Sequence, residues 1–327
     1  MKKLLIVCAV FLVASGFTKE EIASGMDAGI FDEIRRVVTS IKQQQDPDAI
    51  FEAIKKNDYQ AVAKLATKDN VNKRDWTNAT PLMWAANRGQ ENICELLIDR
   101  GASLTATDRD GWTAVMYAVS KNYPNTTRII IQKAKAKKVD EAMLSKRSKK
   151  DETVLSVAVN KNAKKAITVI AKELGIEYRD VNDDTLLMIA VNQNNDLMVQ
   201  YLAHDKKANT NALNEFNETP LINAVYTDRD TDEEKNSRYK IVQILLAHYA
   251  DINAKNIYEK TALMCAAEKN RRGIVRYFLD DDRVQRHNGA KVEINARDVA
   301  GKTALKYAVE FKNYEIVKML IENGETI

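Results

Sequence analysis

The sequence is poor in glycine, proline and cysteine. Its 327 residues include 11 glycines, four prolines and three cysteines. So few glycines and prolines argue against a β-sandwich, a β-barrel or a disordered linker, all of which are rich in turn-forming residues. Cys8 lies in an apolar N-terminal run, and Cys94 and Cys265 fall on different predicted helices. We therefore expect Cys94 and Cys265 to be buried free thiols and not a disulfide.

Residue sets that support catalysis are also missing. The three histidines, His204, His248 and His287, are scattered, and there is no glycine-rich phosphate loop, paired-cysteine cluster or His-Glu-x-x-His segment. His204 and His248 each follow an apolar helical run, so we expect each to interact with the C-terminal end of a helix dipole. The acidic segment 228–234 lacks the glycine and the distal glutamate of a calcium loop. We therefore expect no enzyme, no cofactor and no metal site, with 228–234 as a solvated acidic loop.

The net charge is small for a chain of this length. The formal value is +4 at pH 7. A balance so close to neutral gives no global attraction to nucleic acid or to a membrane surface. We therefore expect no nucleic-acid partner.

The first 16 residues have the organisation of a secretory signal peptide. Lys2 and Lys3 precede a ten-residue apolar run, 4–13, and small residues follow at 14–16. Ten apolar residues are too few to span a bilayer, and a structural helix here would have no polar face. We expect cleavage before Phe17, a periplasmic or secreted protein, and no integral membrane segment after cleavage.

Three helices are predicted between the leader and residue 73. In 17–47, apolar residues such as Ile30, Ile34 and Val37 recur at helical spacing, which indicates one amphipathic helix. Two shorter helices, 49–56 and 59–66, follow it. We expect the side chain of Asp48 to cap the first of them.

One short motif recurs seven times and dominates the rest of the chain. Each copy begins with a threonine, has an aliphatic residue two positions later and has an alanine five positions later. Threonine can cap a helix with its hydroxyl, and spacings of 33, 40, 32, 34, 42 and 42 residues are typical of stacked helical repeats. The threonines are Thr80, Thr113, Thr153, Thr185, Thr219, Thr261 and Thr303.

The best-formed copy carries a family pattern. It reads Thr80-Pro81-Leu82-x-x-Ala85-Ala86, then Gly89, an aliphatic pair, Leu-Leu and Gly-Ala at 101–102. This pattern resembles the ankyrin repeat, of a bacterial exported type, over residues 48–325. The histidine that usually follows the leucine is replaced in all seven copies, by Met83, Met116, Ser156, Met188, Ile222, Met264 and Lys306.

The resemblance implies an all-α solenoid of helix-turn-helix units. We expect about seven full repeats after a degenerate N-terminal cap, in one elongated and monomeric domain, 48–327. The expected boundaries are 48–73 for the cap and 74–106, 107–147, 148–179, 180–212, 213–254, 255–296 and 297–327 for the repeats.

In ankyrin-like proteins, the turns and the ends of the first helices line a groove that binds a partner protein. Carried over to this sequence, the turn candidates are Trp76, Arg109, Trp112, Phe216 and Tyr258, and the helix-end candidates are Arg88, Lys121 and Tyr226. Aromatic side chains are favoured at binding hot spots. The competing interpretation is that each ring packs on a neighbouring turn.

A basic insertion supplies an alternative function. The segment 132–150 holds eight lysines and arginines against Asp140 and Glu141, which suits an anionic polymer or an envelope surface. It has no interleaved aromatic residues that could stack on bases. A solvated extension of a helix is the simpler interpretation of the same residues.

Overall fold

The computed structural model describes residues 48–226, 232–280 and 289–324. The predicted signal peptide and the predicted helix over 17–47 lie outside these residues. So does most of the predicted acidic loop, 228–234, but its last three residues, 232–234, begin a helix, so the prediction of a loop is wrong there. The described residues form two compact units, one of residues 48–85 and 90–103 and one of residues 86–89 and 104–324.

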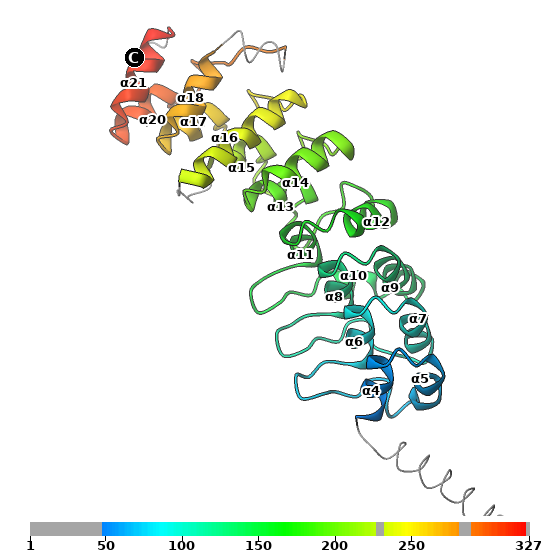
Figure 1. The fold of residues 1–327 in the computed structure, drawn as a ribbon. Helices are drawn as coiled ribbons and strands as arrows, with labels where there is room; N and C mark the ends of the chain where they lie inside the picture. Colours follow the sequence, from blue (N-terminus) through cyan, green and yellow to red (C-terminus); the bar gives the residue numbers. More distant parts are fainter. Residues whose placement is uncertain (1–47, 227–231, 281–288, 325–327) are drawn as a thin grey trace, which may run out of the picture. The chain divides into compact units, whose positions relative to one another are not determined.

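The described residues are helical, as the sequence predicts (Figure 1). They contain no β-strand, only two isolated bridges that join Arg179 to Thr185 and Lys255 to Thr261. The first part of the chain holds α4 (Ala49–Lys55), α5 (Tyr59–Leu65), α6 (Pro81–Asn87) and α7 (Glu91–Asp99).

The remaining helices alternate between short first helices and second helices of varied length. The first helices are α8 (Ala114–Ser120), α11 (Val154–Asn160), α13 (Leu186–Asn192), α15 (Pro220–Tyr226), α17 (Ala262–Glu268) and α20 (Ala304–Glu310). The second helices are α9 (Pro124–Ala136), α12 (Lys164–Leu174), α14 (Asp196–Gln200), α16 (Asp232–Ala247), α18 (Arg272–Leu279) and α21 (Tyr314–Glu322). A π-turn, η1 (Tyr201–Asp205), continues α14, and α10 (Asp140–Leu144) is an extra turn after α9.

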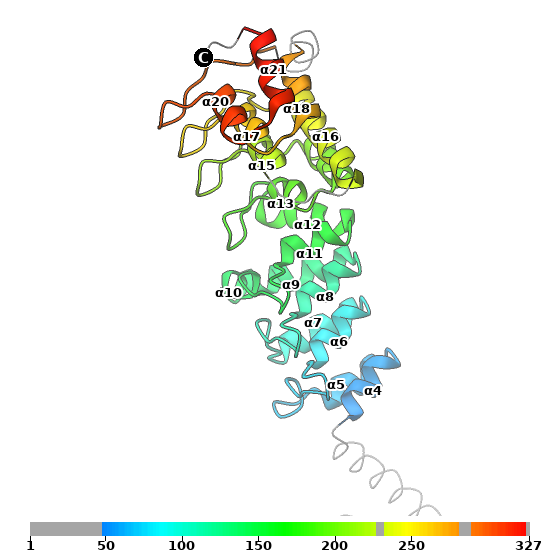
Figure 2. The same cartoon turned by 90° about the vertical axis from the view of Figure 1, so that its left-hand side faces the viewer.

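The helices of the second unit pack in two rows. The first helices contact one another in succession, from α8 through α11, α13, α15 and α17 to α20. In the second row α9 contacts α12, and α14, α16, α18 and α21 contact in turn. Figures 1 and 2 show the turns that precede the first helices projecting beyond them. Each repeat therefore presents one turn and one helix end to solvent.

The alanines of the recurring motif lie at the contacts between neighbouring helices. All seven, from Ala85 to Ala308, are buried. A methyl group is the largest side chain that these contacts accommodate, because a packed interior has few voids that could take more. The invariant alanine is therefore explained by packing between repeats.

The threonines of the motif cap the first helices, as predicted. Each hydroxyl oxygen accepts a hydrogen bond from the backbone N–H three residues later, at 3.2–3.4 Å. This satisfies one of the N–H groups that a helix start leaves without a partner in the helix. In the repeat of Thr153, Ser156 adds the reciprocal bond to the backbone N–H of Thr153.

The prediction for Asp48 is wrong. Asp48 occupies the N-cap position of α4, but its side chain makes no capping hydrogen bond. Its backbone is helical, with φ −99° and ψ −3°, whereas a capping residue has extended backbone that turns the side chain back toward the helix. The carbonyl oxygen of Asp48 instead accepts from the N–H groups of Phe51 and Glu52, at 3.0 and 3.1 Å.

A second repeated position, five residues before each threonine, shapes the turns. Its side-chain oxygen accepts hydrogen bonds from the backbone N–H groups two and four residues later, so the turn is held closed by its first residue. The residues at this position are Asp75, Asp108, Ser148, Asp180, Asn214, Asn256 and Asp298. The turn tips are therefore fixed in shape.

Candidate functional site

Three consecutive turns of the second unit carry exposed apolar side chains. The N–H of Ile257 donates to the carbonyl of Phe216 at 2.9 Å, and the N–H of Val299 donates to the carbonyl of Tyr258 at 3.1 Å. These bonds fix the turns side by side. Phe216, Ile257, Tyr258 and Val299 are 43–65% exposed, and we call these four residues the apolar turn strip. It contains two of the predicted site residues.

A hollow of about 280 Å³ lies beside the strip. It is formed by two consecutive repeats, whose turns and first helices α13 and α15 supply its walls. The lining residues are Asn182, Asp184, Asn192, Asn214, Glu215, Phe216, Glu218, Asn223 and Tyr226. The structure thus brings together the predicted site residues Phe216 and Tyr226. The ammonium group of Lys269 lies over the Tyr226 ring, 4.7 Å from its centroid.

The carboxyl group of Asp184 is the most perturbed group in the hollow. Burial, the nearby carboxylate of Asp180 and that of Asp183 raise its pKa to about 6, and the amide of Asn192 and the guanidinium of Arg179 offset only part of this. The amide of Asn192 donates to Asp184 Oδ2 at 3.2 Å. The local field is therefore negative and unfavourable to the ionised form.

Replacing Asp184 by asparagine is expected to stabilise the protein at pH 7 by about 1 kcal/mol, a value reduced for partial exposure of the carboxyl group. The folded pKa lies above its ordinary value of 3.8, so the folded protein holds the proton more tightly. The gain should shrink as pH falls through 6 and vanish below about 4, where both states are protonated. Urea unfolding at pH 7.5 and pH 3.5 measures this. An equal gain at both values would contradict the charge argument.

The two other predicted aromatic residues differ in exposure. Trp76, in a turn of the first unit, is 79% exposed. Trp112 is half-buried and packs against Tyr117 of its own repeat, with ring centroids 5.2 Å apart. The hydroxyl of Tyr117 donates to Asp108 at 2.5 Å. Trp112 thus contributes to the fold of its turn, and Trp76 is the more accessible ring.

The three predicted basic residues lie apart from the hollow. Arg88, Arg109 and Lys121 are exposed, and none of them is among the residues that line it. Arg109 lies at a turn tip, and Lys121 follows α8. Their positions at a turn and at helix ends agree with the family pattern, and they contribute charge to those surfaces.

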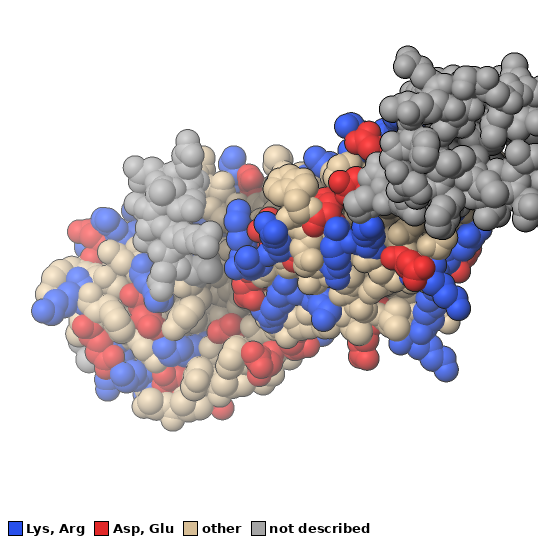
Figure 3. Space-filling model, turned by 90° about the horizontal axis from the view of Figure 1, so that it is seen from below, with Lys and Arg blue, Asp and Glu red and all other residues tan. Residues whose placement is uncertain are grey.

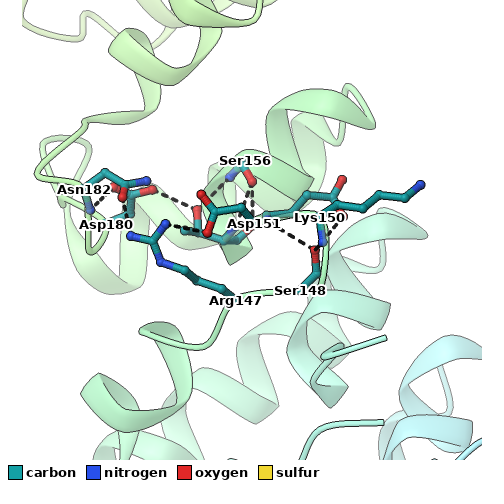
Figure 4. A network of polar contacts seen from close by, with 9 residues as sticks. Arg147, Ser148, Lys150, Asp151, Ser156, Asp180 and Asn182 are labelled. Carbon is teal, nitrogen blue, oxygen red and sulfur yellow. Dashed lines mark hydrogen bonds and ion pairs between the residues drawn. The ribbon is translucent and has the colours of Figure 1, made fainter. Parts of the chain in front are cut away.

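The basic insertion is partly used within the chain. The Lys135 ammonium donates to the carbonyl of Glu173 at 2.8 Å. Arg147 donates to Asp151 at 2.8 Å and also to Asn182, in the turn of the following repeat (Figure 4). Arg147 therefore joins two consecutive turns. On the face in Figure 3, lysines and arginines are interspersed with acidic side chains.

Among the described cysteines and histidines, the two thiols are buried and the two imidazoles pack on each other. Cys94 and Cys265 are free and buried, as predicted, and burial raises the pKa of each thiol to about 12, which keeps them from forming thiolates. His204 and His248 stack edge to face with ring centroids 5.5 Å apart, a contact that sequence reasoning missed. Over the described ranges, no group of three or more His, Cys, Asp or Glu side chains could hold a metal ion. No helix in the same ranges has both the length and the apolar character needed to cross a bilayer.

Sequence reasoning also missed the polar residues of the hollow. Asp184 and Glu218 each directly precede a motif threonine, and Asn192 lies eight positions after Asp184. Aligning the repeats on their threonines and comparing these two positions would have singled them out.

Comparison with protein families gives a match along most of the chain. Residues 35–108, 50–142, 155–256 and 233–327 match the family described as "Ankyrin repeats (3 copies)". Among solved structures, the ankyrin repeat domain of Bcl-3, a member of the IkappaB protein family, superimposes with a TM-score of 0.52 at 27% sequence identity. The match covers 66% of this chain and 92% of that one.

Curated relatives match over shorter stretches. Ankyrin repeat and SAM domain-containing protein 6 of Rattus norvegicus is 39% identical over 80 residues, which is 24% of this chain and 9% of that protein. M-phase phosphoprotein 8 of Rattus norvegicus is 37% identical over 79 residues, 23% of this chain and 9% of that protein. The matched part therefore spans less than a tenth of the length of these relatives.

Proposed function

The chain belongs to the ankyrin-repeat family, whose members are in general non-enzymatic scaffolds for protein–protein interaction, and we propose that it binds a partner protein through the apolar turn strip. The observation that carries the proposal is the set of four exposed apolar side chains on three turns joined by backbone hydrogen bonds. A surface held in one shape before binding loses little conformational entropy when the partner arrives.

The surroundings of the strip support this assignment. Glu215 and Glu259 lie next to it in sequence, and the hollow adds amides and carboxylates at its edge. A centre of aromatic and aliphatic side chains with a polar rim is the usual anatomy of a protein-binding surface. Phe216 and Tyr258 are the expected anchors, because large aromatic side chains contribute most of the binding energy at such surfaces.

Comparative capture tests the proposal. Immobilised wild-type protein and its Phe216→Ala/Tyr258→Ala variant are incubated with extract of the native host, and bound proteins are identified by mass spectrometry. A partner that binds the wild type and is lost from the variant supports the strip as the binding surface. A set of captured proteins identical for both would contradict it.

The basic insertion supports the alternative function less well. An anion-binding module needs lysines and arginines free to meet phosphate or an acidic headgroup. Lys135 and Arg147 instead make hydrogen bonds within the chain. The proposed function therefore rests on the strip, while Lys135 and Arg147 join neighbouring repeats.

We also propose that the protein acts outside the cytoplasm. The support is the order of two lysines, an apolar run and small residues at positions 2–16. N-terminal sequencing of protein purified from its native host is expected to give a chain that begins at or near Phe17. Recovery of an intact Met1 in the cytosolic fraction would contradict this proposal.

A further inference from the structure

In each of the last two repeats, a lysine of the turn forms an ion pair with the last residue of the first helix of its own repeat. The Lys260 ammonium lies 2.7 Å from a carboxylate oxygen of Glu268 and 4.2 Å from the centroid of the Tyr307 ring. The Lys302 ammonium lies 2.7 Å from a carboxylate oxygen of Glu310. A lysine ammonium held by a carboxylate and an aromatic ring is a stable arrangement for a cation.

The hollow occupies the equivalent place in two earlier repeats. Lys260 and Lys302 each directly precede a motif threonine, and the residues at that position in the earlier repeats are Asp184 and Glu218. Thus a carboxylate replaces each lysine. The shorter acidic side chains do not fill the space that the lysines fill, so the hollow remains open to solvent.

The position eight residues after each of these lysines also differs between the later and the earlier repeats. Eight residues after Lys260 and Lys302 stand Glu268 and Glu310, whereas Asn192 and Tyr226 stand eight residues after Asp184 and Glu218. Tyr226 thus stands at the position of Glu268 and Glu310, and the Lys269 ammonium lies over its ring. The earlier pair therefore carries carboxylates at the positions where the later repeats carry lysines.

Amide groups contact the carboxylates of Asp184 and Glu218 in the hollow. The amide of Asn214 donates to Glu218 at 3.1 Å, and that of Asn192 donates to Asp184. Within the part of the chain that the structure describes, neither Asp184 nor Glu218 belongs to an ion pair. The guanidinium of Arg179 lowers the pKa of Asp184, but Arg179 forms its ion pair with Asp183.

We propose that the hollow takes a lysine or arginine side chain of the partner protein. The proposal deepens the partner-binding function and rests on it. Asp184 and Glu218 supply the negative charge, and the face of the Phe216 ring is available to stack on the incoming cation. Since Phe216 belongs both to the hollow and to the apolar turn strip, one basic residue flanked by apolar residues would engage both surfaces.

A peptide titration tests this without knowledge of the partner. The probe is an acetylated hexa-arginine amide, followed by isothermal calorimetry at low salt, with hexa-glutamate as the negative probe. We expect the variant Asp184→Asn/Glu218→Gln to bind hexa-arginine at least about tenfold more weakly than the wild type. Glu218→Lys, which introduces the lysine of the later repeats, should weaken it similarly.

The matched control is Asp205→Asn/Glu315→Gln. It removes the same charge from exposed positions on second helices, so it should change the affinity less than about twofold. Equal losses in the two double variants would show non-specific attraction and overturn the proposal. So would the absence of binding to wild-type protein. Circular dichroism confirms that each variant is folded.

The outcome also separates this proposal from the partner-binding function. If hexa-arginine binding is insensitive to the hollow variant while partner capture still depends on Phe216 and Tyr258, the cation site is wrong and the strip stands. If the hollow variant loses the peptide but no captured protein depends on the strip, the cation site stands and the strip is wrong.

Discussion

Replacing Ala190 by arginine is expected to lower the free energy of unfolding by more than about 4 kcal/mol. Ala190 is fully buried on α13, and α13 contacts both α11 and α15. A larger side chain must push these helices apart, and its guanidinium would be buried without a partner. Both effects act at the centre of the second unit, which makes this the largest stability change among the variants considered.

Urea unfolding followed by circular dichroism measures the loss. Ala247→Arg is the matched control, because Ala247 is exposed on α16 and its replacement should change stability by no more than about 0.5 kcal/mol. Since repeats contact only their neighbours, the Ala190→Arg variant should also show separate transitions for the parts that flank α13. An unfolding curve that matches wild type would show that the helical packing is wrong.

Positions whose role depends on local spacing could be predicted from the sequence. A threonine before a short apolar helix meets the N–H three residues later wherever the helix starts, so the seven caps and the buried alanines follow from the repeat. Asp48 failed because its cap requires extended backbone, and the helical backbone at that residue cannot be read from residue type. The same reasoning found the helices of each repeat but not their continuation, such as the π-turn after α14.

The candidate site could be predicted only in part. Phe216, Tyr226 and Tyr258 were found because the family pattern fixes which positions face solvent. The hollow was not found, because it depends on a comparison of side-chain lengths between repeats. Asp184 leaves open a space that corresponds to the one that Lys260 fills in a later repeat. The contact from Arg147 to Asn182 was missed for a related reason, since it joins two turns whose alignment is set by helix packing.

The second large effect concerns binding. The variant Phe216→Ala/Tyr258→Ala is expected to weaken partner binding by about 2 kcal/mol or more, which is about 30-fold in Kd. Both rings are about half exposed at the turn tips, so their truncation removes contact area from the partner surface. The backbone hydrogen bonds that join the turns do not involve these side chains, and the fold should be retained.

A matched control variant distinguishes the strip from exposed apolar surface in general. Leu197→Ala/Tyr314→Ala removes two large exposed side chains, one on α14 and one on α21, away from the turns. This variant should bind the partner as the wild type does. Trp76→Ala, in the first unit, measures separately whether the partner extends to that exposed ring.

Isothermal titration of the captured partner into the wild type, the Phe216→Ala/Tyr258→Ala variant and the control is the most direct test of the strip as the binding surface. We expect the strip variant to be folded by circular dichroism. It should bind the partner about 30-fold or more weakly than both the wild type and the control variant do. A folded strip variant that binds with wild-type affinity would contradict this expectation.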